Sequence, residues 1–492
     1  MARFNTFKYD DGTLYGTTAS TNLLWTFQVA WDGSYNSPNT LNNEAARMVD
    51  FSSGRGRDYL IQLGGAGLEY YNIGEAVGIF ENSDGRYDPW NTSSPLYPNV
   101  KPGKFVRILV KNGTAGTNYG IMRGIISDIQ PFSRGRDQFV RIVVKDGLQW
   151  LKDRSIEQGL LSSNRIDTYI GYILTKSDWP NTEWAKTGGS ISQSVDSLDY
   201  YWAWKVNALD SIHKLESAEL GAFFHDRDGN ATFRGRDYTY ERTQALTQTE
   251  ILTDIVLPQP WEIVRNRVEI YSYPKILDPV NTTLWQLRDV PAIANGATFN
   301  IDAIFRYSTW RPCGSSITFN HTVNAAADGS GADLTASCPL TFNTDIGDGA
   351  EITITNNSGS NGYITLLRAV GDAIYAPDPG VGKNSDTTSE VAYGPRTLTI
   401  DTPWQESTTT AQSLADFLLA NLKDPNGLPT IQIEGRPTYQ FNLDLYDRVE
   451  LSIAAKGISA NFRVGKIEHK WLNENGQAVR TLFKLEPYWV FT

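Results

Sequence analysis

The sequence predicts a mainly β, multidomain protein with a smaller α+β part. The chain has 492 residues, and at about 150 residues per domain this length predicts three or four domains. Hydrophobic residues make up 40% of the chain and charged residues 20%, which is ordinary globular composition. Most of the sequence alternates apolar and polar residues, a period of two that is typical of strands burying one face.

The predicted strands run through the whole chain. Their alternating apolar positions include Ile108, Val110, Val140, Ile142, Val144, Val268, Ile270, Ile352, Ile354, Ile431, Ile433, Val449, Leu451 and Ile453. Residues that tolerate positive φ separate the runs, at 83–85, 111–113, 145–147, 227–230 and 356–359. We therefore expect antiparallel hairpins to be the main structural unit.

Two segments break the alternation and predict helices. In 206–220 the apolar residues Ala208, Ile212 and Leu215 follow each other at spacings of four and three, as on one face of a helix. In 409–422 a capping box of Thr409 and Gln412 precedes an apolar stripe. Both helices are expected to be amphipathic.

The range 285–390 differs from its surroundings. It holds eleven acidic residues and, with Arg288 counted, five basic ones, so more than half of the net charge of −11 lies there. It is rich in Ala, Thr, Asn, Ser and Gly and has short alternating runs without a helical period. This pattern predicts a β-sandwich inserted into a host domain.

Several classes of function are disfavoured. The negative balance repels phosphate, so nucleic-acid binding is not expected. No two of His213, His225, His321 and His469 lie three or four residues apart, so we expect no metal, and His225 and His469 are interpreted as structural. No nucleotide-binding or serine-elbow motif occurs, so we expect no cofactor and no catalytic residue. The 226–230 segment resembles the start of a calcium loop, but it lacks the later glycine and glutamate and is interpreted as a hairpin turn.

A few features leave alternatives open. Paired glycosidase carboxylates have no sequence spacing and are not excluded. Trp202 and Trp204 form the densest aromatic cluster, for which packing or a subunit contact is favoured over ligand stacking. Cys313 and Cys338 could pair, although two free thiols are favoured in a reducing cytosol. The first residues lack the apolar core of a signal peptide, so we expect a soluble product made in the cytosol.

The segment 54–110 contains GRGR at 54–57, GEAVGIFENSDGRYDP at 74–89 and NTSSPLYPNVKPGKFVRI at 91–108. With these motifs it resembles the amino-terminal domain of minor tail proteins that form the baseplate or tail-tip hub of long-tailed bacteriophages. It continues in GIMRGII at 120–126 and VRIVVKDGL at 140–148. The pattern of a strand, a turn, a proline-bearing excursion and a second strand agrees with it.

Later segments are similar to the same family. The range 208–236 looks like its α+β domain, while YGPRTL at 393–398, DRVEL at 447–451 and FKLEP at 483–487 look like its carboxy-terminal barrel. ANGATF at 294–299 and NNSGSNGYIT at 356–365 resemble an immunoglobulin-like module of such hubs. The resemblance implies a tube-like barrel at 1–165, an α+β domain at 166–260, a second tube-like barrel from 261–284 and 391–492, and an inserted sandwich at 285–390.

The resemblance also implies a function. Such a protein is a non-enzymatic homotrimer whose two barrels per subunit form a ring that joins the tail tube to the tip and gates the DNA channel. Expected partners are other copies of itself, distal tail and tail tube proteins, the tape measure protein, and tip or fibre proteins, with a possible contact to the host cell surface. DNA would pass through without specific binding. The protein would be assembled in the host cytoplasm and reside in the virion tail tip.

The residues expected to matter are architectural. The family's turn and excursion are matched by Asn82, Asp84, Gly85, Arg86, Pro89, Pro95, Pro102 and Gly103, and its carboxy-terminal block by Tyr393 and Gly394. The excursion is expected to form a contact between subunits or domains, and turn chemistry within one subunit remains the alternative. A rival function is binding or cleavage of host surface carbohydrate, with Trp310 and Tyr363 of the insert as contacts.

Overall fold

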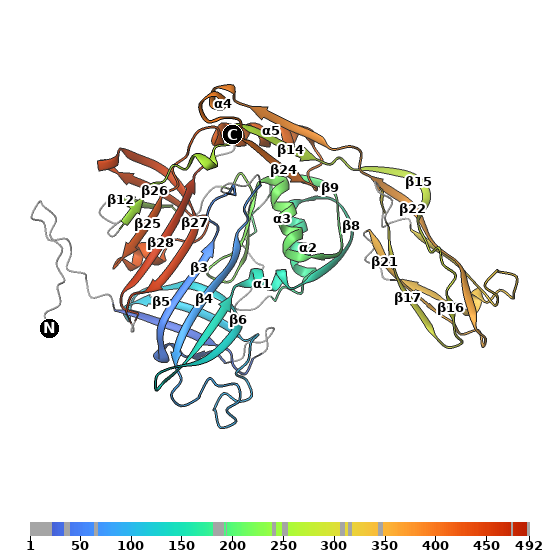
Figure 1. Cartoon of the computed structure of the whole chain (residues 1–492), viewed down its shortest axis with the longest axis horizontal. Coiled ribbons are helices and arrows are strands. Elements are labelled where there is room, and N and C mark those ends of the chain that lie inside the picture. The colour runs from blue at the N-terminus through green and yellow to red at the C-terminus, as the bar shows by residue number, and fades with distance from the viewer. Residues whose placement is uncertain are drawn as a thin grey trace, which may run out of the picture.

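The computed structural model describes residues 22–33, 40–62, 67–180, 191–192, 194–238, 243–247, 254–305, 310–312, 317–342, 348–473 and 476–489. Strands predominate, which confirms the expected mainly β, multidomain fold. Figure 1 shows a body of sheets and helices from which an arm of strands extends on one side. No helix in these ranges is long and apolar enough to cross a membrane.

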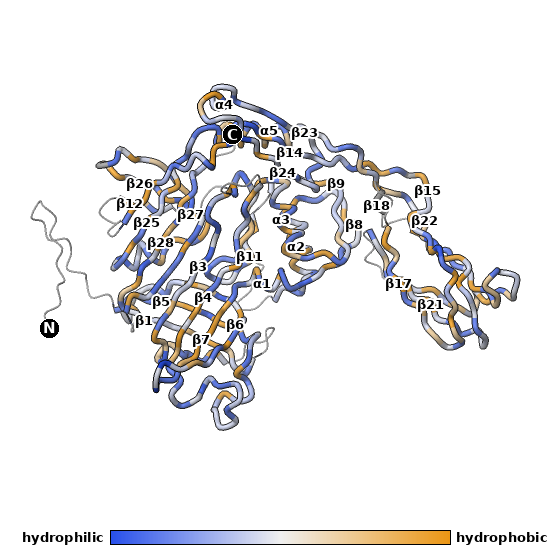
Figure 2. Tube along the Cα trace, in the orientation of Figure 1, coloured by the Kyte–Doolittle hydropathy of each residue, from blue (hydrophilic) through white to orange (hydrophobic). Residues whose placement is uncertain are grey.

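The N-terminal β-domain consists of antiparallel strands in the order β3-β4-β7-β6-β5-β1-β2. Its strands are β1 (Leu23–Val29), β2 (Asn42–Asn43), β3 (Met48–Gly56), β4 (Asn72–Glu81), β5 (Phe105–Asn112), β6 (Asn118–Arg134) and β7 (Asp137–Lys145), and the short 3-10 helix η1 (Ala45–Arg47) precedes β3. Hydrophobic and hydrophilic residues alternate along them (Figure 2). Side chains such as Phe27, Phe80, Ile108 and Ile142 are fully buried in one core.

The C-terminal β-domain continues this sheet. It contains β12 (Thr243–Thr247), β13 (Asp254–Val256), β25 (Thr430–Glu434), β26 (Arg448–Ile453), β27 (Ile458–Trp471) and β28 (Val479–Pro487), with α6 (Pro437–Phe441) and η4 (Ala454–Lys456) between strands. β27 pairs with β3, with Lys466 opposite Gly56 and Lys470 opposite Ser52. The two domains therefore share one 13-stranded sheet. The sequence predicts 243–256 in the α+β domain, but β12 and β13 pair with β26 and β25 instead.

The α+β domain packs three helices against two antiparallel strand pairs, β8–β9 and β10–β11. It comprises α1 (Gly147–Lys152), β8 (Ser155–Arg165), α2 (Ile166–Lys176), β9 (Ser197–Asn207), α3 (Ala208–Glu219), β10 (Ala222–His225) and β11 (Ala231–Arg234). Helix α3 and the turn at Asp228 and Gly229 confirm the expectations for 206–220 and 226–230. Helices α1 and α2 were not predicted, because the β-branched and aromatic residues of α2 favour strands and only its burial decides otherwise.

A separate layer covers the top of the body in Figure 1. It consists of β14 (Arg267–Ser272), β23 (Gly380–Ser385), β24 (Thr397–Thr402), α4 (Thr387–Tyr393) and α5 (Thr408–Leu422), preceded by η2 (Trp261–Ile263). We expected 261–284 and 391–492 to form one barrel, but β14 and β24 form their own sheet with β23, a strand from the expected insert range. Helix α5 is confirmed, although its capping residue is Ser407, and Gln412 bonds to Lys383 instead.

The insert is a sandwich of two sheets. One sheet contains β15 (Ile276–Gln286), β16 (Ala292–Ile293), β18 (Trp310–Pro312), β19 (Thr318–Asn324) and the long central β22 (Gly362–Tyr375). The other contains β17 (Thr298–Ile304), β20 (Leu340–Phe342) and β21 (Gly349–Thr355). The 3-10 helix η3 (Thr335–Ser337) lies between β19 and β20 in the sequence. Apolar residues from both sheets, among them Ala303, Ile352 and Leu367, form one core.

Helix α3 carries a buried carboxyl group. Glu216 is 1% exposed, and its carboxyl accepts a hydrogen bond from the backbone N–H of Phe223. His213, one turn earlier, stacks on Tyr70 with ring centroids 4.2 Å apart. Burial raises the pKa of Glu216 to about 8. The folded protein therefore keeps a proton on Glu216 at neutral pH.

This proton predicts a pH dependence of stability. Between the ordinary glutamate pKa of 4.5 and the raised value of about 8, the folded state binds a proton that the unfolded state has lost. The free energy of unfolding should then fall by up to about 1.4 kcal/mol per pH unit as pH rises through this window. Chemical denaturation of Glu216→Gln from pH 5 to 8 should show a shallower decline than the native chain. The exposed substitution Glu81→Gln is the control, and equal slopes for all three proteins would contradict the assignment.

Candidate functional site: the junction of the β-domains and the β4–β5 loop

The junction of the two β-domains contains buried charges next to the β3–β27 pairing. Arg57 follows β3 directly and is 2% exposed. Its guanidinium contacts Glu486 of β28 through Nε to Oε1 at 2.8 Å and Nη2 to Oε2 at 3.1 Å. Arg463 of β27 lies 3.2 Å from the same carboxylate. Burial opposes ionisation of Glu486, but the charges of Arg57 and Arg463 outweigh it and lower its pKa.

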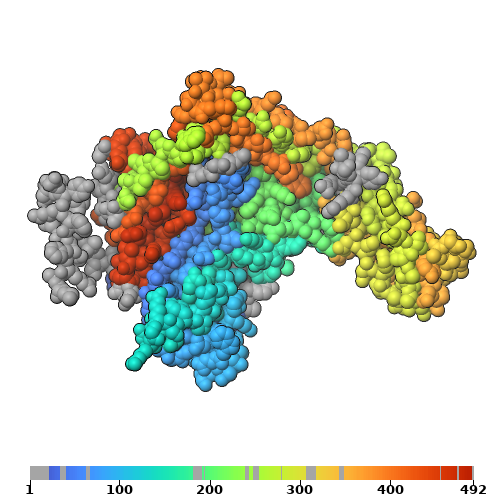
Figure 3. All heavy atoms as spheres, in the orientation of Figure 1, coloured from blue at the N-terminus to red at the C-terminus, as the bar shows by residue number. Residues whose placement is uncertain are grey.

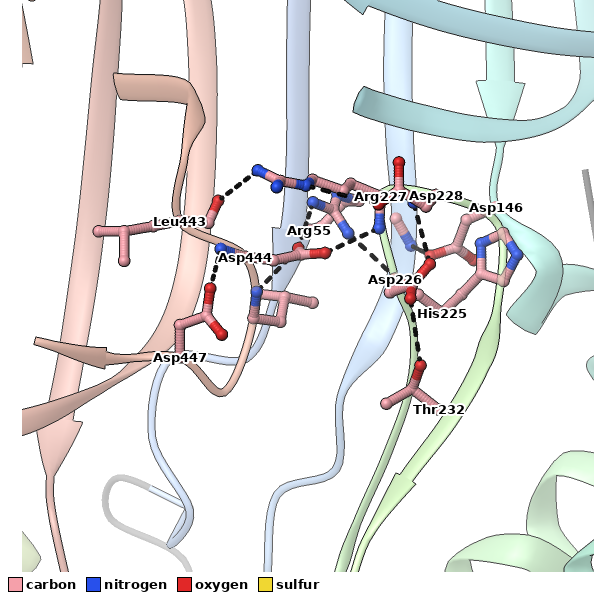
Figure 4. A network of polar contacts seen from close by, with 12 residues as sticks. Arg55, Asp146, His225, Asp226, Arg227, Asp228, Thr232, Leu443, Asp444 and Asp447 are labelled. Carbon is pink, nitrogen blue, oxygen red and sulfur yellow. Dashed lines mark hydrogen bonds and ion pairs between the residues drawn. The ribbon is translucent and has the colours of Figure 1, made fainter. Parts of the chain in front are cut away.

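A second buried network joins three parts of the chain (Figure 4). Asp444 of the C-terminal β-domain accepts a hydrogen bond from Arg55 of β3, with Nη2 2.7 Å from Oδ1. Its other oxygen accepts the backbone N–H of Arg227, in the β10–β11 turn, at 2.9 Å. The Arg227 side chain donates to the carbonyls of Phe441 and Asn442. One carboxylate thus connects both β-domains and the hairpin.

The electrostatics of this network favour an ionised Asp444. Burial opposes ionisation, but the charges of Arg55 and Arg227 outweigh it and lower the pKa of Asp444. Burial and the nearby Asp444 raise the pKa of Asp226, whose carboxyl accepts bonds from the turn amides of Asp228 and Asn230. Among the described residues no cluster of His, Cys, Asp or Glu could hold a metal. The 226–230 segment is a turn stabilised by hydrogen bonds among its own residues.

The β4–β5 loop contains most of the architectural residues expected from the sequence. Asn82 fixes its start, because its side chain accepts the N–H of Tyr87 and donates to Asp88, each at 2.9 Å. Gly85 has φ of +64°, which favours glycine in this turn. The structure brings Asn82, Asp84, Gly85, Arg86 and Pro89 together in one compact turn.

A buried carboxylate that sequence reasoning missed anchors this turn. Glu44 is 4% exposed and accepts hydrogen bonds from Arg86 at 2.9 Å, from the Tyr87 hydroxyl at 2.7 Å and from Trp31 at 2.9 Å. On the surface, Asp84 forms a two-point ion pair with Arg47. Glu44 directly precedes η1 and Arg47 is its last residue, so this segment anchors the start of the loop.

The outer half of the loop is uncharged, and it combines exposed aromatic side chains with Leu96 and Val100, which are buried in the core. No charged residue occurs in 89–100, and Trp90 is 81% and Tyr97 48% exposed. Pro95 and Pro102 lie at its surface, and the Gly103 N–H returns the chain to β6 by bonding the Ile126 carbonyl at 2.8 Å. The loop projects at the bottom of the molecule in Figures 1 and 3. A rigid base therefore presents exposed aromatic side chains.

Tyr393 and Gly394 lie far from this loop, at the end of α4. Gly394 has φ of +76°, and its N–H bonds the Glu390 carbonyl to end the helix. Its carbonyl accepts the side-chain N–H of Asn266 at 2.8 Å. Figure 1 shows α4 at the opposite end of the body from the β4–β5 loop. Tyr393 and Gly394 therefore end helix α4, and Gly394 attaches this end of the helix to the residue that precedes β14.

The structure does not bring Trp310 and Tyr363 together. Both lie in the β22 sheet, but Trp310 of β18 pairs with Tyr375, at the other end of β22 from Tyr363. Twelve residues of strand correspond to roughly 40 Å. The two backbone positions therefore lie at opposite ends of β22, and the carbohydrate function stays a prediction. Cys338 is a buried free thiol, and Cys313 lies outside the described residues.

The remaining aromatic and histidine interpretations concern packing. Trp202 and Trp204 are each 8% exposed, which confirms packing for this cluster. His469 is buried and bonds the Thr481 hydroxyl at 2.9 Å, and the His225 ring accepts the Gly147 N–H. Burial lowers the pKa of His469 to about 3, so it is neutral. Both histidines are structural, as expected.

Sequence reasoning missed the junction charges, although one signal was present. Arg55 and Arg57 are two residues apart in the sequence, a spacing that places two side chains on the same face of an extended strand. A paired arginine on a face that is otherwise buried requires buried acidic partners. Asp444 and Glu486 lie about 400 residues away in the sequence. They can be recognised as the partners of these arginines only once β3 and β27 are known to pair.

Comparison with solved structures relates this fold to tail proteins. The tail protein from Neisseria meningitidis is similar over 94% of this chain and 96% of its own, with a TM-score of 0.51 and 11% identity. The 43 kDa tail protein of prophage MuSo2 from Shewanella oneidensis matches over 94% and 98%, with a TM-score of 0.48 and 10% identity. No protein-family model and no curated protein matches the sequence. The chain shares the fold of the Neisseria protein, and the resemblance to tail proteins is confirmed at the level of fold.

Removing the central carboxylate should destabilise the junction. Asp444→Ala leaves the buried Arg55 guanidinium without its ion-pair partner and the Arg227 backbone N–H without its acceptor. Breaking a buried ion pair in this way costs roughly 3–5 kcal/mol of unfolding free energy. Denaturant titration measures this loss directly. Asp137→Ala, which removes an exposed carboxylate from the β6–β7 turn, is the control and should cost under about 0.5 kcal/mol. A loss no larger than that of the control would contradict the role assigned to Asp444.

Proposed function

We propose that the protein is a structural component of a phage-type tail, in which several copies form a hub ring at the tail tip. The observation that carries this proposal is the continuous sheet that places two β-domains side by side in one chain. The fold shared with the Neisseria tail protein, over nearly the full length of both chains, supports the same assignment. The role is structural, and no residue is assigned to catalysis.

The edges of the sheet support assembly into a ring. In the described residues the main strand path ends at β2 and at β13, two short strands at opposite ends of the sheet. An edge of one copy can meet the other edge of the next copy, and such head-to-tail contacts close into a ring when the rotation fits. Three copies would place six β-domains around one axis, which suits a tail tube of sixfold symmetry. The proposed partners are tube, tape measure and tip proteins, with DNA passing through the centre.

Electron microscopy of the purified full-length protein tests the ring. Class averages should show a threefold ring with a central opening and the inserts at its rim. A chain that remains monomeric at high concentration, both alone and together with tail tube protein, would contradict the proposal.

The β4–β5 loop provides a second test. Trp90 is the most exposed aromatic side chain described, and tryptophan side chains dominate many interfaces. Trp90→Ala should weaken self-association at least tenfold by analytical ultracentrifugation, and Arg86→Ala should weaken it less by loosening the anchor on Glu44. Trp261→Ala, at the other end of the body and 55% exposed, is the control. Unchanged association of both loop variants would show that the loop is only a turn within one subunit.

A further inference from the structure

The insert contacts the body at β9 and at the 404–406 segment. Near the root of the insert, Trp202 of β9 packs with Ile374 of β22 and with Trp404, whose ring centroid is 5.0 Å away. Lys275, just before β15, bonds Glu406 at 3.1 Å, and Glu406 accepts the backbone N–H groups of β9 at Asp199 and Tyr200. The Lys275 and Glu406 side chains are 6% and 12% exposed. The root is therefore fixed by buried contacts.

Further along, β9 contains a bulge that faces the insert. Val206 pairs with Ile156 and Ala203 with Gln158, so β9 has one more residue than β8 between these pairs. Lys205 lies in this bulge with φ of +47°, a conformation that lysine rarely adopts. Bulges redirect side chains, and strained residues persist where their contacts hold them. The contacts of this bulge are with the β17–β21–β20 sheet of the insert.

Two neighbouring residues of the bulge contact that sheet. Lys205 Nζ lies 2.6 Å from Asp302 of β17 and 2.9 Å from Glu351 of β21. The Trp204 ring lies so close to Gly349 of β21 that a Cβ there would be 2.5 Å from it. Figure 3 shows the insert packed against the α+β domain at this side, while its far end projects outward.

The two acidic partners need a cation between them. Asp302 and Glu351 are directly opposite each other on β17 and β21, and like charges in this arrangement repel. Lys205 neutralises this repulsion only while the insert is docked. The three side chains are 41–52% exposed, so salt screens their interaction, whereas the root contacts are shielded from it.

The insert also has a place to bend. Beyond its root, the register of β15 and β22 shifts between Asp278 and Thr282, where three residues of β15 face one of β22. Val280 within this bulge is 64% exposed and makes no core contact in the described residues. The pairing is regular again from Trp285 onward. An interruption of the β15–β22 pairing therefore separates the fixed root from the rest of the sandwich.

We propose that the insert is an arm with a docked and a released position, that it pivots at the 278–282 bulge, and that Lys205 with Trp204 is the latch that holds it docked. Low ionic strength favours the docked arm and high ionic strength releases it. The proposal concerns one chain and holds whether or not the chain forms a ring.

Distance measurement by double electron–electron resonance tests the latch in the full chain. Spin labels are attached at Arg136→Cys on the body and Ala327→Cys near the tip of the insert, both at exposed turns. Cys313→Ser removes one native thiol, and Cys338 is retained because it is buried. The native latch should give one distance population at low salt and a second, different population near 1 M salt, where the screening length falls to about 3 Å.

Variants separate the latch from a loss of folding. Lys205→Glu should show the second population already at low salt, and Lys205→Glu combined with Glu351→Lys should restore the first. Gly349→Leu, which displaces the Trp204 ring, should release the arm without changing charge. Lys214→Glu makes the same charge change on the exposed face of α3 and should behave like the native chain. One unchanged distance population for the native chain at both salt concentrations and for Lys205→Glu would overturn the proposal.

Discussion

The pairing of β3 with β27 is the constraint on which the rest of the structure depends. It joins strands separated by about 400 residues in the sequence. It also brings Arg55 and Arg57 into contact with Asp444 and Glu486, which lie near the other end of the sequence. Each buried carboxylate is ionised because two arginines surround it. Loss of the pairing would leave the charges of these two arginines and two carboxylates buried without partners. The two β-domains are therefore held in one register and cannot slide past each other.

This constraint also positions the surfaces that carry the proposed function. The continuous sheet fixes the N-terminal domain, and with it the β4–β5 loop, relative to the sheet edges at β2 and β13. The β10–β11 turn reaches the same junction through Arg227. Helix α3, which leads into that hairpin, follows β9 directly in the chain. The insert is thus tied to the junction through β9, although it lies at the far side of the molecule.

The sequence predicted the elements whose structure is determined by local patterns of residues and not by distant contacts. Helix α3 follows from the spacing of Ala208, Ile212 and Leu215, and the turns of the β4–β5 loop follow from Asn82 and Gly85. Helix α2 was missed because its Ile and Tyr residues favour strands, whereas burial in the core of the α+β domain stabilises it as a helix. Glu44, Asp444 and Glu486 could not be assigned, since nothing near them in the sequence indicates their distant partners. The separation of Trp310 from Tyr363 likewise depends on the length of β22.

Native-state hydrogen exchange tests the central claim most directly. If β3 and β27 are neighbouring strands of one cooperative sheet, their amides should exchange with the same free energy of opening, close to that of global unfolding. Asp444→Ala should then lower the protection of both strands by the same amount. Exchange of β27 at a distinctly lower free energy than β3, with β3 unaffected by Asp444→Ala, would show two independent domains and contradict the account.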